Sequence, residues 1–156
     1  MYVVTADQVG SRTGTDRVPQ TLLALDGLSP APTRPFERTA GDEIQGVSDT
    51  PGGVLEIVTS LVRQGDWRIG IGIGPVELPL PASPREGRGP AFIAAREAVA
   101  AAHPVAAQLA VRLGMPAATS PAATAHAATS DPAGGRRATA DGELQRQRHT
   151  DLAEGA

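Results

Sequence analysis

The chain has no cysteine and no lysine, and it contains few aromatic residues. Without cysteine it can form neither disulfides nor thiolate metal sites. Without lysine it can supply neither a Schiff base nor the phosphate-binding lysine of a P-loop. With one Trp, one Tyr and two Phe, its core must be built from Val, Ile, Leu and Ala. These absences exclude several kinds of chemistry and predict an aliphatic core.

Long hydrophobic runs and an excess of positive charge are also missing. No apolar run approaches the roughly 20 residues that a membrane span requires. The first residues carry no basic segment of the kind that begins a secretory signal. A formal net charge of −3 argues against nucleic-acid binding, because nucleic-acid-binding faces are normally basic. These features predict a cytoplasmic protein with neither a membrane nor a nucleic acid as partner.

The composition changes near residue 103. Residues 116–130 consist mostly of Ala, Thr, Ser and Pro, and such a segment buries too little apolar surface to offset the entropy lost on ordering. We therefore predict a folded region over residues 1–102 and a low-complexity, largely disordered tail over residues 103–156. Within this tail, residues 141–149 could form a short charged helix.

Apolar periodicity before residue 103 predicts four strands and three helices in the order strand, helix, strand, strand, helix, strand, helix. The expected strands are 2–6, 34–39, 43–47 and 68–74, and the expected helices are 19–25, 52–64 and 90–102. This order predicts an α+β domain of the ferredoxin-like type, in which helices cover one face of an antiparallel sheet.

The strand at 68–74 alternates Ile with Gly, so its isoleucines and its glycines point to opposite faces. A row of glycines implies that a helix or a ligand approaches the backbone closely. The spacing does not fit a dinucleotide-binding fingerprint, because Pro75 stands where a third glycine would be needed. We interpret these glycines as close-packing residues.

Two aspartates could reach the same end of this sheet. Asp7 follows the first strand, and Asp42 lies in the turn between the strands at 34–39 and 43–47. If the first strand pairs beside that hairpin, the two carboxylates attract a hard cation such as Mg²⁺ or Mn²⁺, which prefers oxygen ligands. Asp is also common in turns, so an ordinary turn role fits the same two residues.

Gly10 and Ser11 follow Asp7 in a polar segment. Their backbone N–H groups could hold a phosphate at the start of a helix. A plain flexible loop fits the same residues.

Four segments in sequence order resemble the SatD family, small bacterial proteins whose N-terminal region is similar to class III adenylate and guanylate cyclases. The segments are TADQVGS (5–11), AGDEIQG (40–46), RIGIGIGP (68–75) and GPAFIAARE (89–97). The resemblance covers roughly residues 1–102. It implies a nucleotidyl-cyclase-like fold, a nucleoside triphosphate as ligand, and a homodimer.

In the cyclases, the aspartates that match Asp7 and Asp42 bind metal ions, and an arginine that matches Arg96 stabilises the transition state. The resemblance implies these roles here. Phe92 stands where the cyclases have a catalytic asparagine, and no lysine is present for purine recognition. These departures favour a regulatory domain that binds metal and nucleotide and is catalytically weak or inactive, and no reaction follows from the sequence.

A second hypothesis is a non-enzymatic, dimeric interaction or transcription-associated protein. SatD proteins usually continue into a helical region that often ends in a helix-turn-helix motif. Here only AVRLGM (110–115) is similar to the middle of such a motif, and Pro121 would break the recognition helix that should follow. The resemblance therefore implies at most a degenerate remnant of that motif.

Overall fold

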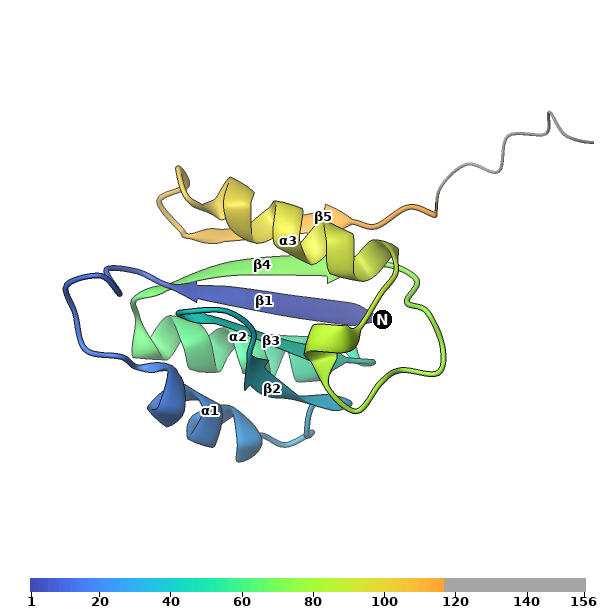
Figure 1. The fold of residues 1–156 in the computed structure, drawn as a ribbon, viewed down its shortest axis with the longest axis horizontal. Helices are drawn as coiled ribbons and strands as arrows, with labels where there is room; N and C mark the ends of the chain where they lie inside the picture. Colours follow the sequence, from blue (N-terminus) through green and yellow to red (C-terminus); the bar gives the residue numbers. More distant parts are fainter. Residues whose placement is uncertain (117–156) are drawn as a thin grey trace, which may run out of the picture. The chain divides into compact units, whose positions relative to one another are not determined.

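The computed structural model describes residues 1–116, which form an α+β fold with a five-stranded mixed sheet and three α-helices (Figure 1). The strands are β1 (Tyr2–Gln8), β2 (Arg34–Arg38), β3 (Glu43–Ser48), β4 (Trp67–Ile73) and β5 (Leu109–Leu113). The helices are α1 (Val18–Asp26), α2 (Pro51–Gln64) and α3 (Pro90–Ala102), with a short 3₁₀ helix η1 (Pro84–Glu86). Seven of these elements agree with the seven predicted from periodicity, apart from their exact ends.

The strands lie in the order β2-β3-β1-β4-β5. β1 occupies the centre and pairs antiparallel with both β3 and β4, and β2 pairs antiparallel with β3. β5 pairs parallel with β4, and the chain reaches it from β4 through α3. The prediction of an antiparallel sheet is therefore correct for four strands and wrong for the fifth.

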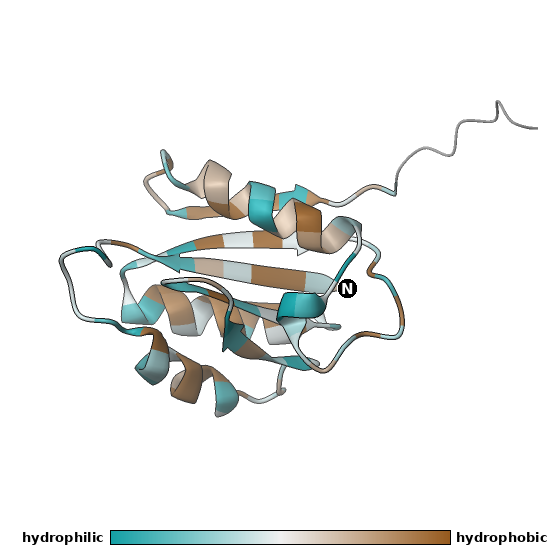
Figure 2. Cartoon of the chain, viewed as in Figure 1, coloured by the Kyte–Doolittle hydropathy of each residue, from teal (hydrophilic) through white to brown (hydrophobic). Residues whose placement is uncertain are grey.

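Helices cover both faces of this sheet. The larger apolar core joins Ile69 and Ile71 of β4 to residues of α1 and α2, including Leu25 and Ile57. The smaller core, on the other face, joins Val3 and Val47 to α3. The prediction that helices lie on one face is wrong, because α3 crosses from β4 to β5 on the face opposite α1 and α2 (Figures 1 and 2).

The glycines of β4 allow α3 to lie almost on the strand. A Cβ atom built on Gly72 would lie 2.0 Å from the carbonyl oxygen of Ala91, and one built on Gly70 would lie 2.2 Å from the backbone nitrogen of Val99. Both distances are far below van der Waals contact, so no residue with a side chain fits at either position without moving the helix. The predicted close packing is confirmed, and the element packed there is a helix.

The folded region extends beyond the predicted boundary at residue 102. β5 lies in the segment that composition assigned to the tail. The segment 110–115, compared above with a helix-turn-helix, forms most of β5 and the residues directly after it. The helix predicted at 141–149 and Pro121 lie outside the described residues. None of the described helices is long and apolar enough to cross a membrane.

Candidate metal and phosphate site

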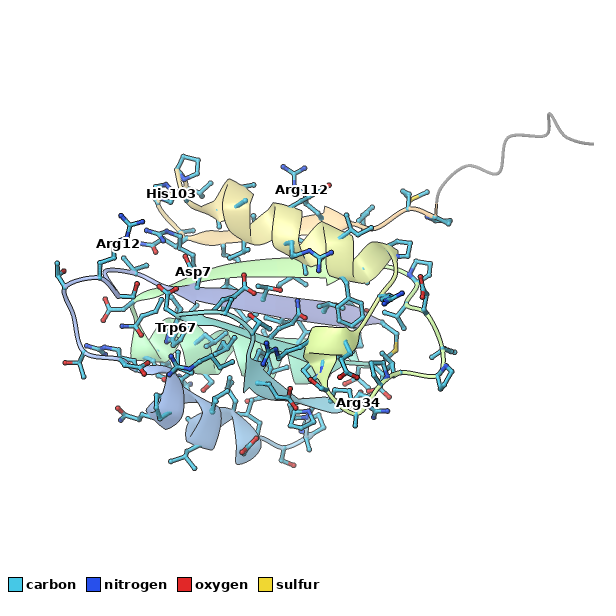
Figure 3. All side chains as sticks on the ribbon, viewed as in Figure 1. Asp7, Arg12, Arg34, Trp67, His103 and Arg112 are labelled. Carbon is cyan, nitrogen blue, oxygen red and sulfur yellow. The ribbon has the colours of Figure 1, made fainter. Side chains whose placement is uncertain are left out.

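Asp7 lies near the end of β1, on the face of the sheet that α3 partly covers. Because side chains alternate along a strand, Val3, Thr5 and Asp7 share this face. Val3 is in the core beneath α3, and Thr5 is buried and accepts a hydrogen bond of 2.9 Å from Gln45 Nε2. The Asp7 side chain is 35% exposed. The face therefore changes from buried to solvent-accessible at Asp7, which Figure 3 labels.

Asp42 lies beside the same end of β1. The turn between β2 and β3 contains Gly41 with a φ of +55°, and the Glu43 N–H donates to the Ala40 carbonyl oxygen at 2.9 Å. The register pairs Asp7 with Glu43, and the N–H of Gln8 donates to the carbonyl oxygen of Asp42 at 3.2 Å. The structure therefore brings the two predicted aspartates together.

The charge of Asp42 affects the ionisation of Asp7. The pKa of Asp7 is raised above its usual value of 3.8, first because the group is partly buried and second because the negative charge of Asp42 repels its ionised form. Asp42 also raises this pKa as a hydrogen-bond partner, whereas Arg68 opposes the shift by a hydrogen bond and by its charge. The net shift is upward, so repulsion and burial outweigh the arginine.

Arg68 is a site residue that sequence reasoning missed. It stands opposite Asp7 in the β1–β4 register, and its Nη1 donates to Asp7 Oδ2 at 3.2 Å. Its side chain is 20% exposed. The alternation of side chains along β4 could have predicted this contact. Arg68 lies on the same face as Gly70 and Gly72, and this is also the face of Asp7. The cluster thus contains two carboxylates and one guanidinium.

Arg38, which the sequence analysis also missed, connects the Asp42 turn to the start of α1. Its Nη1 donates to the carbonyl oxygen of Gly41 at 2.6 Å, and its Nη2 donates to Asp16 Oδ2 at 2.6 Å. Asp16 Oδ1 in turn accepts the N–H of Val18 at the start of α1, at 3.0 Å. Arg38 therefore helps to fix the position of the turn that carries Asp42.

Gly10 and Ser11 lie in a turn directly after β1. Gly10 has a φ of +74°, and its carbonyl oxygen accepts the N–H of Gly14 at 3.0 Å. Helix α1 begins only at Val18, so the expectation that these residues stand at a helix start is wrong. The buried side chain of Gln8 holds the loop, donating to the Thr15 carbonyl oxygen at 2.7 Å.

Phe92 and Arg96 lie one helical turn apart on α3 and have opposite environments. Phe92 is 1% exposed and packs in the smaller core with Val3 and Val47. Arg96 is exposed. Residues four apart on a helix lie on the same side, so Arg96 is on the flank of α3 nearest β1. The structure therefore places Phe92 in the core and leaves Arg96 accessible.

A pocket of about 560 Å³ lies elsewhere, within the loop of residues 77–88. Leu80 of this loop and Val76, just before it, pack against the core that contains Val3. From Val3 to Asp7 the strand extends about 13 Å, at 3.2–3.4 Å per residue. The pocket is therefore at the other end of β1 and takes no part in the aspartate cluster.

Within residues 1–116, no group of three or more His, Cys, Asp or Glu side chains is arranged to hold a metal ion. Two carboxylates could still contribute to a site whose remaining ligands are water or phosphate oxygens, the usual arrangement for Mg²⁺. No family model, curated protein or solved structure matches the chain.

Proposed function

We propose that the domain binds a divalent metal ion together with a nucleoside triphosphate, and that it is a regulatory domain of the SatD type with weak or no catalytic activity. The observation that carries this proposal is the position of Asp7 and Asp42 at the same end of the sheet, where the carbonyl oxygen of Asp42 accepts a backbone hydrogen bond from Gln8. Mg²⁺ or Mn²⁺ bound there would neutralise negative charge on the phosphates. Both aspartates would act as oxygen ligands.

The topology supports the proposed family. The unit β1-α1-β2-β3-α2-β4 has the strand order β2-β3-β1-β4 with every neighbouring pair antiparallel. From this connectivity we propose a ferredoxin-like unit to which α3 and β5 are added. The aspartate pair lies at one end of this sheet, on the face away from α1 and α2.

The donor chemistry fits a hard cation. Asp7 and Asp42 offer only oxygen atoms, and Asp7 is partly buried beside a like charge. A bound cation would relieve that repulsion. Arg96, on the flank of α3 nearest β1, and Arg68 are the basic groups that we assign to phosphate oxygens, because guanidinium groups bind phosphate in two-pronged fashion. These two arginines would allow an anion to bind beside acidic residues.

The environment of Phe92 favours binding over turnover. Its ring is in the core and offers no hydrogen-bond donor to a reacting phosphate. Without a polar group at this position, the domain would lack one of the contacts that stabilise the transition state in the cyclases. We therefore propose a domain that senses a nucleotide and does not cyclise it.

A thermal-shift titration with ATP or GTP, with and without Mg²⁺ or Mn²⁺, tests the proposal. We expect metal and nucleotide together to raise the melting temperature of the wild type. Asp7→Asn and Asp42→Asn should abolish the rise, whereas Asp26→Asn, a change at an exposed aspartate on α1, should preserve it. If no combination of metal and nucleotide raises the melting temperature of the wild type, the proposal is refuted.

A dimeric interaction protein without metal chemistry is the second candidate. In the described part of the chain, β5 forms an edge of the sheet, and its Val111 and Leu113 are 53% and 71% exposed. An unpaired edge with exposed apolar side chains favours pairing with another chain. Self-association that persists in Asp7→Asn and Asp42→Asn, without any nucleotide effect in the wild type, would favour this candidate.

A further inference from the structure

We infer that two copies of this chain associate through their β5 strands, which pair antiparallel across a two-fold axis at Val111. The inference rests on the second candidate function and specifies its partner and its contact. It concerns the free edge of the sheet, away from the aspartate pair, and holds whether or not a metal ion binds at Asp7.

The outer edge of β5 presents backbone groups to another strand. Within residues 1–116, β5 has a neighbouring strand on one side only. The N–H of Ile69 donates to the carbonyl oxygen of Gln108, and the N–H of Gly114 donates to the carbonyl oxygen of Ile73, both at 2.7 Å. Alternate residues of a strand direct their backbone groups to the same side, so the residues of the other parity direct theirs away from β4. These are Leu109, Val111 and Leu113.

The same three residues form an apolar face that the helices cover only in part. The register sets Leu109, Val111 and Leu113 beside the isoleucines of β4, so they share the face of α1 and α2. Leu109 packs against the larger core, whereas Val111 and Leu113 are 53% and 71% exposed. An edge strand with exposed apolar side chains favours pairing with another strand.

The residues of β5 favour one register. With the two-fold axis at Val111, each Leu109 stands opposite Leu113 of the other copy, and the outward backbone groups of all three residues are paired. Arg112 then stands opposite Ala110. With the axis one residue further on, Arg112 would face Arg112 of the other copy, and like charges directly opposite each other destabilise a strand pair. The axis at Val111 therefore matches the apolar residues and separates the arginines.

Glu97 is the charged residue on the side of α3 that faces β5. Phe92 points from α3 toward β1 and β3, where it packs in the smaller core. At about 100° per residue, Ala94, Glu97 and Ala101 lie on the side of the helix away from Phe92. Glu97 is exposed. The side of α3 above the free edge thus carries small residues and one carboxylate.

In the proposed pair, Glu97 approaches Arg112 of the other copy. The backbone of Val99 lies over Gly70, which stands beside Ala110 in the β4–β5 register. Glu97 belongs to the same helical turn as Val99, and the two-fold axis sets Arg112 of the other copy opposite Ala110. Within residues 1–116, neither Arg112 nor Glu97 forms an ion pair. Figure 3 shows Arg112 at this edge of the molecule. Pairing with a second copy would bring these opposite charges together.

The chain that follows β5 matches this edge less well than a second copy does. Residues 117–156 contain two bulky apolar residues, Leu144 and Leu152, and neither belongs to a run of alternating apolar residues. A strand that pairs with β5 needs apolar side chains on one face to match Val111 and Leu113. β5 of another copy has that pattern.

Analytical ultracentrifugation of the full chain measures the association. We expect the wild type to be dimeric at micromolar concentrations and Val111→Lys to be monomeric, because two ammonium groups would meet at the axis. Leu23→Lys, a change at a leucine on α1 that is 75% exposed, should remain dimeric. Thermal melts show whether both variants are folded. A dimer that persists in a folded Val111→Lys variant would overturn the inference.

Single cysteines test the register, since the chain has none of its own. With oxidised glutathione, Val111→Cys should give a disulfide-linked dimer, because the two Cα atoms at the axis would be about 5.5 Å apart. In Leu113→Cys the two Cα atoms would be about 13 Å apart, since four residues along the strand separate them, and no disulfide should form. Linkage at residue 113 without linkage at residue 111 would contradict the register.

A charge exchange tests the contact between the helices and the strands. Arg112→Glu and Glu97→Arg should each raise the dissociation constant of the dimer several-fold, because each brings like charges together. The double variant should return it to near the wild-type value. A double variant that associates as weakly as the single variants would contradict this contact.

The failures of the inference and of the second candidate function can be told apart. A dimer that persists in Val111→Lys and is not linked in Val111→Cys overturns the β5 contact, and the second candidate stands. A wild type that is monomeric throughout the concentration range refutes both. Nucleotide binding is tested separately with Asp7→Asn.

Discussion

Arg68 Nη1 and Asp7 Oδ2 lie 3.2 Å apart across the β1–β4 pair. Asp42 acts on the same carboxyl group from the hairpin between β2 and β3, and the balance of these effects with burial leaves the pKa of Asp7 raised. A carboxyl group held in a partly buried, repulsive environment lowers the stability of the fold at neutral pH. Such an arrangement is typical of binding sites, where stability is lost in exchange for function.

The first prediction concerns pH. Because the pKa of Asp7 in the folded state is raised above 3.8, the folded state holds this proton more strongly than the unfolded state. Its contribution to stability is therefore present at low pH and lost as the pH rises from about 3.8 through the raised value. The Asp7→Asn variant has no carboxyl group to titrate at this position, so it should not show this loss of stability. Thermal melts between pH 3 and 7 should show a difference, wild type minus variant, that falls with rising pH, and a flat difference would refute the electrostatic account.

The second prediction concerns the contact between α3 and β4. Gly72→Ala would place a Cβ atom 2.0 Å from the carbonyl oxygen of Ala91, so we expect it to destabilise the fold by about 1–3 kcal/mol, as overpacking does. Gly52→Ala adds the same methyl group on α2, where no atom lies within 4 Å. It should be neutral or stabilising. Urea unfolding measures the stability of both variants. If Gly72→Ala is as stable as Gly52→Ala, the described packing of α3 on β4 is contradicted.

The third prediction concerns Phe92, which the proposed resemblance aligns with the cyclase asparagine. Phe92→Asn replaces a buried ring with an amide, and a buried Phe typically contributes about 3–5 kcal/mol over a small residue. We expect a strongly destabilised or unfolded protein and no gain of activity. Ile93→Asn, at a neighbouring position that is 52% exposed, should remain folded. A stable Phe92→Asn variant that produces cyclic nucleotide would show that the position belongs to an active site and not to the core.

The fourth prediction concerns Arg38, which we regard as a positioning residue. Arg38→Met removes the bonds to Gly41 and Asp16 and should lower the affinity for Mn²⁺–ATP several-fold by releasing the Asp42 turn. Because the ion pair with Asp16 is exposed to solvent, which screens it, the stability of the fold should change little. Arg63→Met is the matched control. An unchanged affinity, measured by calorimetry, would exclude the positioning role.

Much of the fold could be predicted from periodicity. The alternation of Ile and Gly at 68–74 predicted both the strand and its close contact, because side chains alternate between the two faces of a strand whatever strands pair with it. β5 could not be predicted in this way. Its five residues follow an Ala-rich helix. Its pairing with β4 depends on the path of the chain through α3, which the residues of β5 alone do not predict.

The candidate site could be predicted only in part. Asp7 and Asp42 were identifiable because each lies at the end of a recognisable element. Arg68 requires the β1–β4 register, and Arg38 requires the path of the loop to Asp16, so both depend on tertiary structure. The helix start expected at Gly10 and Ser11 was wrong, because the loop after β1 runs to Val18 before α1 begins.

The fifth prediction tests the central claim, that Asp7 and Asp42 together hold a metal ion. Titration calorimetry with Mn²⁺–ATP should compare the wild type, Asp7→Asn, Asp42→Asn and the double variant. If both carboxylates ligate one ion, each single variant should lose most of the affinity, and the double variant should lose little more. Tight binding that survives in the double variant, or an absence of binding in the wild type, would contradict the metal site.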